Sequence, residues 1–254
     1  MRRAIQYVKV TVITAVLNGE GTIGATLGSV SSQDYAPIEH IVVDGASTDT
    51  TLEAVQRAQH SGLRVFSDKD SGVYQAFNRG LREATGDVVV FLNCGDVYCT
   101  HTVISTMMNT LAAADVEAVF GDVAVVNSRQ PDRMIRRYSS SKFRPSRMRY
   151  GLMPAHPTLF LRRKVYEMVG EYDEHYRIAG DFEFCLRAFL AHGIRFRYVP
   201  EVLVSMPAGG LSNRGWRSKW EITMEMLRAC RNNGVKSNLA MLCARVPLKM
   251  MELI

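Results

Sequence analysis

The chain has 254 residues, a formal net charge of +6 and a hydrophobic share of 47%. This size fits one large α/β domain, or one domain with an appendage, with enough apolar side chains for a core. No apolar run approaches the roughly 18–20 residues of a membrane span. The five scattered cysteines form no Cys-x-x-Cys pair, which argues against a disulfide framework or a zinc site and favours a reducing, cytoplasmic location.

Three short apolar runs in the first hundred residues each end at a polar cluster, at 10–14, 41–43 and 88–92. Each is β-branched and precedes a stretch of helical periodicity, a pattern that predicts buried parallel strands. Since the carboxyl ends of such strands share one edge of the sheet, ligands bind there. We expect that edge to collect the polar residues that follow the runs: Asn18, Asp44, Asp49, Asn93 and Asp96.

The other elements are predicted from periodicity and from turn residues. In chain order, we expect a helix over 21–33, a helix capped by Ser47 or Asp49, a strand over 64–67, helices over 73–84 and 103–113, strands over 116–126 and 158–161, a helix along 182–189, and a strand over 195–199. Residues 127–149 are polar, basic and poor in branched aliphatic side chains, so we expect a mobile or loosely ordered loop there.

The positive charge is concentrated in two segments. Eight Lys and Arg residues fall between Arg129 and Arg149 against one acid, Asp132, and eight more fall between Arg214 and Lys249. A basic face attracts nucleic acid, anionic lipid or phosphorylated substrates, and composition alone leaves all three open.

Five segments match, in order and in spacing, the motifs of one enzyme family. They are T-A-V-L-N at 14–18, I-V-V-D-G-A-S-T-D-T-T at 41–51, the stretch from D-S-G-V-Y to A-F-N-R-G at 70–80, F-L-N-C-G-D at 91–96 and A-G-D-F-E-F at 179–184. Together they resemble family 2 glycosyltransferases of the GT-A fold over roughly residues 10–190. The resemblance implies an α/β, Rossmann-like three-layer fold with a mostly parallel central sheet, and sugar transfer from a nucleotide-sugar donor.

A nucleotide base presents a ring N–H, which a carboxylate at a strand end can accept. Asp44 is our candidate for this contact, with Thr14, Ala15 and Asn18 lining the same pocket. The resemblance adds further nucleotide-sugar contacts: Gly45, Ser47, Asp70, Gly72, Asn78, Asn93 and His156. The alternative for the acids is a turn or helix cap, which suits Asp49 better than Asp44 and competes at Asp70. A lone histidine such as His156 is more often structural.

A departing diphosphate carries charge that a divalent cation held by carboxylates neutralises. The resembled family usually has an acidic D-x-D cluster after the fourth strand, where this chain has Asn93, Cys94, Gly95 and Asp96. Asn93 can still bond a ribose hydroxyl, and Asp96 alone keeps a charged ligand for Mn²⁺ or Mg²⁺. Substrate phosphates can supply other ligands. The alternative for Asp96 is a cap for the helix that follows.

Inverting sugar transfer needs a base that removes the proton of the acceptor hydroxyl. Asp181 is our candidate, because it follows the small residues Ala179 and Gly180 at the start of a helix and matches the position that the family uses. The alternative is a helix N-cap, and the two roles are compatible.

The expected organisation is a catalytic domain over 1–208 and a basic amphipathic helical tail over 209–254. Residues 1–100 form the nucleotide-sugar-binding half, and 101–208, with the basic loop 127–150, form the acceptor half. In the tail, apolar residues repeat at helical spacing: Leu239, Leu242, Cys243, Val246 and Met250. With Trp216 and Trp220 among basic residues, the tail can lie on an anionic bilayer. The alternative is packing on the catalytic domain or on a second subunit.

These expectations combine into one function. We expect an inverting, metal-dependent transferase that moves a sugar, preferably from a UDP donor, to a glycan or polyprenyl-diphosphate-linked acceptor in cell-surface polysaccharide synthesis. It would lie in the cytoplasm or peripherally on the inner face of the cytoplasmic membrane. The missing acids at Asn93 and Gly95 leave a non-catalytic nucleotide-sugar-binding protein as the alternative. Nucleic-acid binding by the basic segments lacks any recognised module.

Overall fold

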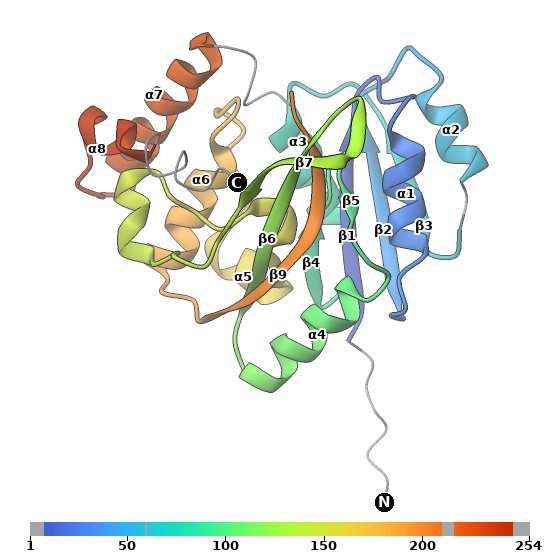
Figure 1. Cartoon of the computed structure of the whole chain (residues 1–254), viewed down its shortest axis with the longest axis horizontal. Helices are drawn as coiled ribbons and strands as arrows, with labels where there is room; N and C mark the ends of the chain where they lie inside the picture. Colours follow the sequence, from blue (N-terminus) through green and yellow to red (C-terminus); the bar gives the residue numbers. More distant parts are fainter. Residues whose placement is uncertain (1–7, 59, 210–215, 246–254) are drawn as a thin grey trace, which may run out of the picture.

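The computed structural model describes residues 8–58, 60–209 and 216–245. Over these residues the strands form one nine-stranded sheet in the order β3-β2-β1-β4-β8-β6-β9-β5, with β7 paired to β6 (Figure 1). The strands are β1 Val10–Val16, β2 Ile38–Asp44, β3 Leu63–Ser67, β4 Val88–Phe91, β5 Val97–Tyr98, β6 Ala118–Asn127, β7 Gln130–Tyr138, β8 Phe160–Arg162 and β9 Phe196–Pro207.

Helices cover both faces of this sheet. The helices of the described residues are α1 Ile23–Ser31, α2 Thr51–Arg57, α3 Val73–Glu83, α4 Val103–Ala114, α5 Arg163–Val169, α6 Gly180–Cys185, α7 Trp216–Asn232 and α8 Leu239–Cys243. Short 3-10 turns η1 Pro145–Tyr150 and η2 His156–Thr158 precede β8, and a π-helical turn η3 Leu186–Ala191 continues α6.

The first half of the sheet is parallel, as the short apolar runs predict. β1 pairs in parallel with β2 and β4, and β2 pairs in parallel with β3. The second half is mixed, because β8 runs antiparallel to β4 and β6 while β6 and β9 run parallel. The predicted α/β class with a mostly parallel central sheet is confirmed.

The alternating side chains of β1 face two different helical layers. Val10 and Val12 are fully buried in a cluster that contains Ile104 of α4, whereas Ile13 lies in a cluster with Phe77 of α3. This alternation is the period of a β-strand. The sheet is therefore covered by α1, α2 and α4 on one face and by α3, α5 and α6 on the other (Figure 1).

The prediction of a loosely ordered loop over 127–149 is wrong. The segment contains the mostly exposed strand β7, which forms an antiparallel hairpin with β6, and it ends in η1. The buried carboxylate of Asp122 on β6 holds the segment, since it accepts hydrogen bonds from Arg137 Nε (2.8 Å), the Ser140 amide (2.7 Å) and the Tyr198 hydroxyl (3.0 Å). The polar composition reflects a strand whose first residues face solvent, not disorder.

The helices of the tail pack on the rest of the molecule. Met226, Leu227 and Cys230 of α7 lie in the same buried cluster as Phe182 of α6, and Leu242 of α8 joins them. Of the predicted tail stripe, Val246 and Met250 fall outside the described residues. Of its other members, Leu242 is buried, whereas Leu239 and Cys243 are exposed. The packing alternative therefore holds for the buried face of α7 and for Leu242. Over the described residues, no helix is both long and apolar enough to cross a bilayer.

Candidate active site

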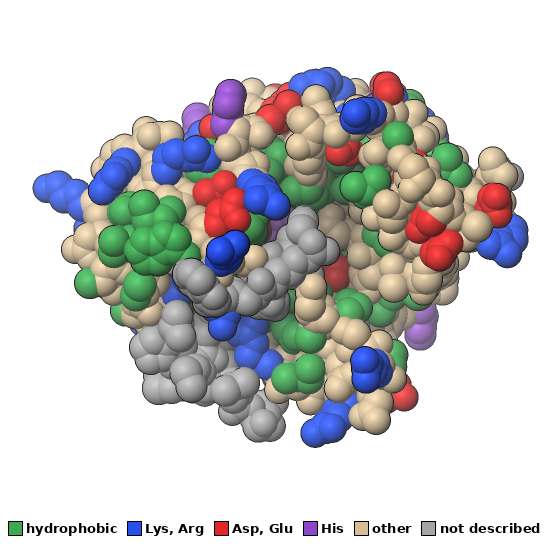
Figure 2. Space-filling view, turned by 90° about the horizontal axis from the view of Figure 1, so that it is seen from above, with side chains coloured by type: hydrophobic (Ala, Val, Ile, Leu, Met, Phe, Trp, Pro, Cys, Tyr) green, Lys and Arg blue, Asp and Glu red, His purple; other side chains and the backbone are tan. Residues whose placement is uncertain are grey.

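The carboxyl ends of β1, β2 and β4 meet at one edge of the sheet, which we call the rim. Val16 is paired with Asp44, and the Cys94 amide donates to the Ala15 carbonyl (3.3 Å). The loops after β1 and β2 are also joined, because the Thr48 amide donates to Asn18 Oδ1 (2.9 Å). Viewed from above, where these strands end, the surface is hollowed near its centre (Figure 2). The rim brings together residues from three separate sequence motifs.

Asp44 closes the turn after β2. Its side chain is fully buried and accepts hydrogen bonds from the Ser47 amide (3.1 Å), the Ser47 hydroxyl and the Ser67 hydroxyl (2.6 Å). The Ser47 hydroxyl oxygen in turn accepts from the Asn18 amide (2.8 Å). These bonds give Asp44 the turn-forming role, and its contact with a nucleotide base remains a prediction.

Asp70 lies against the same turn. A Cβ atom added to Gly45 would come within 2.7 Å of Asp70 Oδ2, so the close approach of this carboxylate requires a glycine at position 45. Burial raises the pKa of Asp70, the Asp44 carboxylate raises it further, and a hydrogen bond from the Gly72 amide opposes the rise. Asp44 and Asp70 therefore form a pair of neighbouring acids at the rim, a pair that can accept N–H or O–H groups.

Asp49 caps the start of α2, as the alternative to a ligand-binding role predicted. Its carboxylate accepts from the amide of Thr51, the first residue of α2, at 3.0 Å, and also from the Thr51 hydroxyl and the Glu20 amide (3.3 Å). The hydrogen bond from the Thr51 hydroxyl is the largest cause that lowers the pKa of Asp49. This cap stabilises the start of α2.

The turn after β4 contains two buried oxygen-bearing side chains without partners. Asp96 is 5% exposed as a residue, its carboxylate accepts no hydrogen bond from any described residue, and burial raises its pKa to about 8. Asn93 Oδ1 is likewise buried and unpaired within the described chain. Gly95, at φ +95°, takes the left-handed conformation that this turn requires. Buried polar atoms are normally hydrogen-bonded. The unpaired Asn93 oxygen and the nearby Asp96 carboxylate therefore suit a ligand.

A divalent cation fits this turn only with help from its substrate. Among the described residues, no group of three or more His, Cys, Asp or Glu side chains could hold a metal ion. Asp96 would supply the single charged ligand and Asn93 a neutral oxygen. Mg²⁺ commonly binds to one or two carboxylates together with substrate phosphates and water. The donor set is therefore sufficient for a cation shared with a diphosphate and insufficient for a tight resident metal.

Asp181 stands in the first turn of α6, beside the start of α3. Its Oδ1 accepts from the Phe182 amide (2.7 Å) and lies 3.5 Å from the Tyr74 hydroxyl. Tyr74 is buried, and its ring packs where a Cβ of Gly180 would stand, within 2.8 Å of that position. Burial and the Asp181 charge raise the pKa of Tyr74. Tyr74 is the second residue of α3, a helix that begins directly after Asp70 and Gly72 at the rim. Its contact with Asp181 therefore connects Asp181 to the rim.

Three predicted contact residues have side chains in the interior instead. The Thr14 hydroxyl donates to the Leu92 carbonyl (2.7 Å) and also contacts His40 Nε2 (2.9 Å). Asn78 is 1% exposed, and both of its N–H donors are used, by the Tyr172 carbonyl and by Glu174 Oε1 (2.9 Å each). The prediction that these two side chains contact the nucleotide sugar is therefore not supported.

His156 is the third. It is buried beside the Phe77 and Phe91 rings, whose centres lie 5.7 and 5.5 Å from the centre of its own ring, and its Nε2 lies 2.9 Å from the Tyr172 hydroxyl. Burial lowers the pKa of His156 to about 4, so the ring is neutral at pH 7. This is the structural role that a lone histidine most often has, and the predicted contact with the donor is not supported.

Ser67, the last residue of β3, was not singled out from the sequence, and its hydroxyl donates to Asp44. It had the same signal as the other rim residues, a polar residue at the end of an apolar strand. The contact between Tyr74 and Asp181 had no local signal, because the two residues lie 107 positions apart in the sequence.

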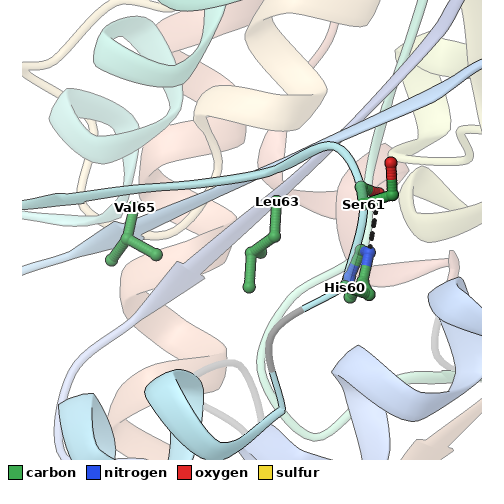
Figure 3. A pocket seen from close by; sticks show the side chains of 4 residues that line it. All are labelled: His60, Ser61, Leu63 and Val65. Carbon is green, nitrogen blue, oxygen red and sulfur yellow. Dashed lines mark hydrogen bonds between the residues drawn. The ribbon is translucent and has the colours of Figure 1, made fainter.

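A separate shallow hollow of about 400 Å³ lies along the outer strand β3 (Figure 3). It is lined by His60, Ser61, Leu63 and Val65, and His60 Nδ1 lies 3.1 Å from the Ser61 carbonyl oxygen. None of the predicted site residues lines it, so it is not the candidate site.

Comparison with curated proteins agrees with the five motifs. The family model described as Glycosyl transferase family 2 matches residues 11–170. A PGL/p-HBAD biosynthesis glycosyltransferase of Mycobacterium tuberculosis is 31% identical over 208 residues, which are 80% of this chain and 78% of that protein. An uncharacterized glycosyltransferase of the same species is 30% identical over 190 residues, 71% of this chain and 69% of that protein.

Solved structures show the same fold. The structure of S. aureus TarS in complex with UDP-GlcNAc has a TM-score of 0.69 and 20% identity, over 92% of this chain and 70% of that chain. The mannosyltransferase PcManGT from Pyrobaculum calidifontis, in complex with GDP-Man and Mn²⁺, has a TM-score of 0.65 and 22% identity, over 88% of this chain and 65% of that chain. At these identities the likeness shows the fold, and the predicted GT-A architecture is confirmed.

Proposed function

The chain belongs to glycosyl transferase family 2, and we propose that it is an inverting, metal-assisted enzyme that moves a sugar from a nucleotide-sugar donor to a glycan or lipid-linked acceptor. A UDP donor and a role in cell-surface polysaccharide synthesis are part of the proposal. The observation that carries it is the turn after β4, where the Asp96 carboxylate and Asn93 Oδ1 are buried at the rim without partners among the described residues.

Each acid at the rim has a distinct task in this proposal. Asp44 and Asp70 accept hydrogen bonds from N–H and O–H groups of the base and the ribose. Asp96 and Asn93 would hold the cation. A bound Mn²⁺ or Mg²⁺ neutralises the charge that develops on the diphosphate. The PcManGT structure with GDP-Man and Mn²⁺ and the TarS structure with UDP-GlcNAc support both ligand classes within this fold.

Asp181 is the proposed general base. The acceptor oxygen attacks the anomeric carbon, the new glycosidic bond forms, and the bond from that carbon to the diphosphate oxygen breaks. The nucleoside diphosphate leaves with the bonding electrons, and the Asp181 carboxylate takes the hydroxyl proton. The position of Asp181 at the start of a helix, with one oxygen bonded to the Phe182 amide, supports a carboxylate with a fixed orientation.

Peripheral membrane contact through the tail is a further part of the proposal. On α7, Trp220 and Met224 are 55% and 40% exposed, near Arg217 and Lys219 in the sequence. Figure 2 shows apolar side chains with Lys and Arg around them on the side of the molecule that carries α7. A basic surface with an interfacial aromatic residue suits an anionic bilayer, which would bring a lipid-linked acceptor to the enzyme.

A non-catalytic nucleotide-sugar-binding protein is the second candidate. It is favoured by one feature, the loss of the acidic side chains that the family usually has at positions 93 and 95. Such a protein would bind UDP with little dependence on metal and would turn over no donor.

A panel of donors tests the proposal. The purified protein is melted with UDP-glucose, UDP-galactose, UDP-GlcNAc, GDP-mannose and dTDP-rhamnose, each with and without Mn²⁺, and release of the nucleoside diphosphate is measured in parallel. We expect one donor to raise the melting temperature in the presence of Mn²⁺, since a ligand that binds only the folded state stabilises it, and to be slowly hydrolysed. Binding without turnover of any donor would favour the second candidate.

A further inference from the structure

The segment in front of Asp181 is held by a single carboxylate from α7. Glu225 Oε1 accepts the Arg177 amide (2.8 Å), and Glu225 Oε2 accepts the amides of Ile178 (2.9 Å) and Ala179 (2.8 Å). Three consecutive backbone N–H groups therefore converge on one side chain, and hydrogen bonds to an ionised acceptor are the strong ones. We call residues 177–179 the clamped segment.

Tyr74 holds the clamped segment from the opposite side. Its hydroxyl donates to the Ile178 carbonyl at 2.6 Å, so Ile178 is bonded through its amide to α7 and through its carbonyl to α3. Gly180, two residues after Ile178, packs against the Tyr74 ring so closely that a Cβ atom would not fit there. The backbone that leads into Asp181 is thus fixed between two helices that are distant in sequence.

Other residues of α7 contact the same region through side chains. The Arg228 side chain donates to the His175 carbonyl (2.9 Å), and its guanidinium lies 4.2 Å from the centre of the Tyr176 ring. Arg177 Nη1 lies 3.3 Å from Glu221 Oε1. These contacts involve exposed side chains, whereas those of Glu225 bind the backbone directly.

We propose that Glu225 is a positioning residue for sugar transfer, which makes the C-terminal helix α7 a functional part of the active site. By fixing the clamped segment, Glu225 sets the place and direction of Asp181 relative to the acceptor. The proposal rests on the proposed function, in which Asp181 is the base. A misplacement of about 1 Å of a reacting group can lower a rate about a hundredfold, so loss of the clamp affects turnover more than donor binding.

The test compares Glu225→Gln with Glu221→Gln in the full chain. The side-chain amide introduced by Glu225→Gln keeps one acceptor oxygen but turns an NH₂ group toward backbone donors, whereas Glu221, one turn earlier on the same helix, bonds to the Arg177 side chain. With the panel donor that the wild type hydrolyses fastest, we expect Glu225→Gln to lower kcat about 10- to 100-fold and to leave KM for the donor within about twofold. Glu221→Gln is expected to match the wild type.

A double-mutant cycle separates positioning from general stability. In the Asp181→Asn background, Glu225→Gln should cause no further loss of the residual rate, because there is no base left to position. An equal further loss there, or a KM increase as large as the fall in kcat, would overturn the proposal.

Hydrogen exchange gives a readout that does not depend on activity. The amides of the clamped segment should exchange faster in Glu225→Gln than in Glu221→Gln or the wild type. Unchanged exchange would overturn the clamp itself, and faster exchange with unchanged kcat would overturn its effect on catalysis. If Asp181→Asn keeps full turnover while exchange in Glu225→Gln is accelerated, the proposed role of Asp181 fails and the clamp is still established as a contact.

Discussion

The turns after β2 and after β4 lie at the same edge of the sheet, yet their buried carboxylates have opposite surroundings. Asp44 accepts hydrogen bonds from Ser47 and Ser67, while Asp96 accepts none from the described residues. A buried carboxylate with full hydrogen bonding stabilises a fold, and one without partners destabilises it until a ligand arrives. Burial and strand position alone therefore do not identify a cation-binding acid, whereas missing hydrogen-bond partners do.

The largest expected effect concerns the third acid of the site, Asp181. Asp181→Asn should lower turnover of the preferred donor about 10²- to 10⁴-fold, the usual contribution of a general base, and leave UDP binding unchanged. Steady-state kinetics and a UDP titration measure the two quantities. Full turnover in this variant would place the base elsewhere and leave Asp181 as a helix cap.

The variant Asp44→Asn tests whether the hydrogen-bonded carboxylate of Asp44 stabilises the fold. The amide loses the charge and points an NH₂ group at donors of Ser47 and Ser67, so we expect the free energy of unfolding to fall by about 2–4 kcal/mol. Urea denaturation followed by circular dichroism measures this change. Asp132→Asn, at an exposed position of β7, is the control and should stay within about 0.5 kcal/mol of the wild type. Equal stability of both variants would remove the structural role of Asp44.

The pH dependence of the free energy of unfolding tests whether the Asp96 carboxylate lacks partners in the folded protein. The pKa of Asp96 is raised to about 8 in the folded protein from an ordinary value of 3.8, so the folded state keeps a proton that the unfolded chain releases above about pH 4. Stability from this group is therefore present at low pH and is lost as pH rises toward 8. His156 and His40, with pKa values lowered to about 4 and about 3 by burial, are neutral above pH 7.

Between pH 7 and pH 8 the metal-free wild type should therefore lose about 1 kcal/mol of stability, because a folded pKa of about 8 means that Asp96 already releases part of its proton in this interval. Asp96→Asn, which does not titrate, should lose much less over the same interval. Denaturation curves in EDTA at both pH values provide the comparison. Parallel losses in the two proteins would mean that Asp96 has a partner when it is folded.

The smallest expected effect is that of Trp220→Ser. Because Trp220 is 55% exposed on α7, this change should leave the unfolding free energy within about 0.5 kcal/mol. It should nevertheless weaken co-sedimentation with vesicles that contain anionic phospholipid. Unchanged sedimentation would argue that this surface contacts protein or solvent instead of a bilayer.

Much of the parallel half of the sheet, the strands β1 to β4, could be predicted from the sequence. The apolar runs over 10–14, 41–43 and 88–92 became β1, β2 and β4 because buried parallel strands are continuously apolar and end at polar turns. The same pattern placed Asn18, Asp44 and Asp96 near one edge, whereas Asp70 was predicted from the family resemblance. The start of a helix beside Asp181 was also foreseen, since small residues and an acid mark such a position.

The features that could not be predicted from the sequence depend on contacts between residues that are distant in the chain. Asn78 turned inward because Tyr172, 94 residues away, offers it a backbone carbonyl and amide, and no local pattern contains that information. The strand β7 has no alternation of apolar residues, since its first residues face solvent. The long strand β9 continues past Pro200 through a register shift against β6, where a proline would ordinarily end a predicted strand.

Melting of the wild type and of Asp96→Asn at pH 8, alone and with Mn²⁺ and UDP together, shows whether Asp96 binds the cation. The unpartnered carboxylate predicts that Asp96→Asn melts at a higher temperature than the wild type when both are ligand-free. It also predicts that only the wild type gains stability from Mn²⁺ in the presence of UDP. A variant that melts lower than the wild type and still shows the full Mn²⁺-dependent gain would contradict the ligand-binding role of Asp96.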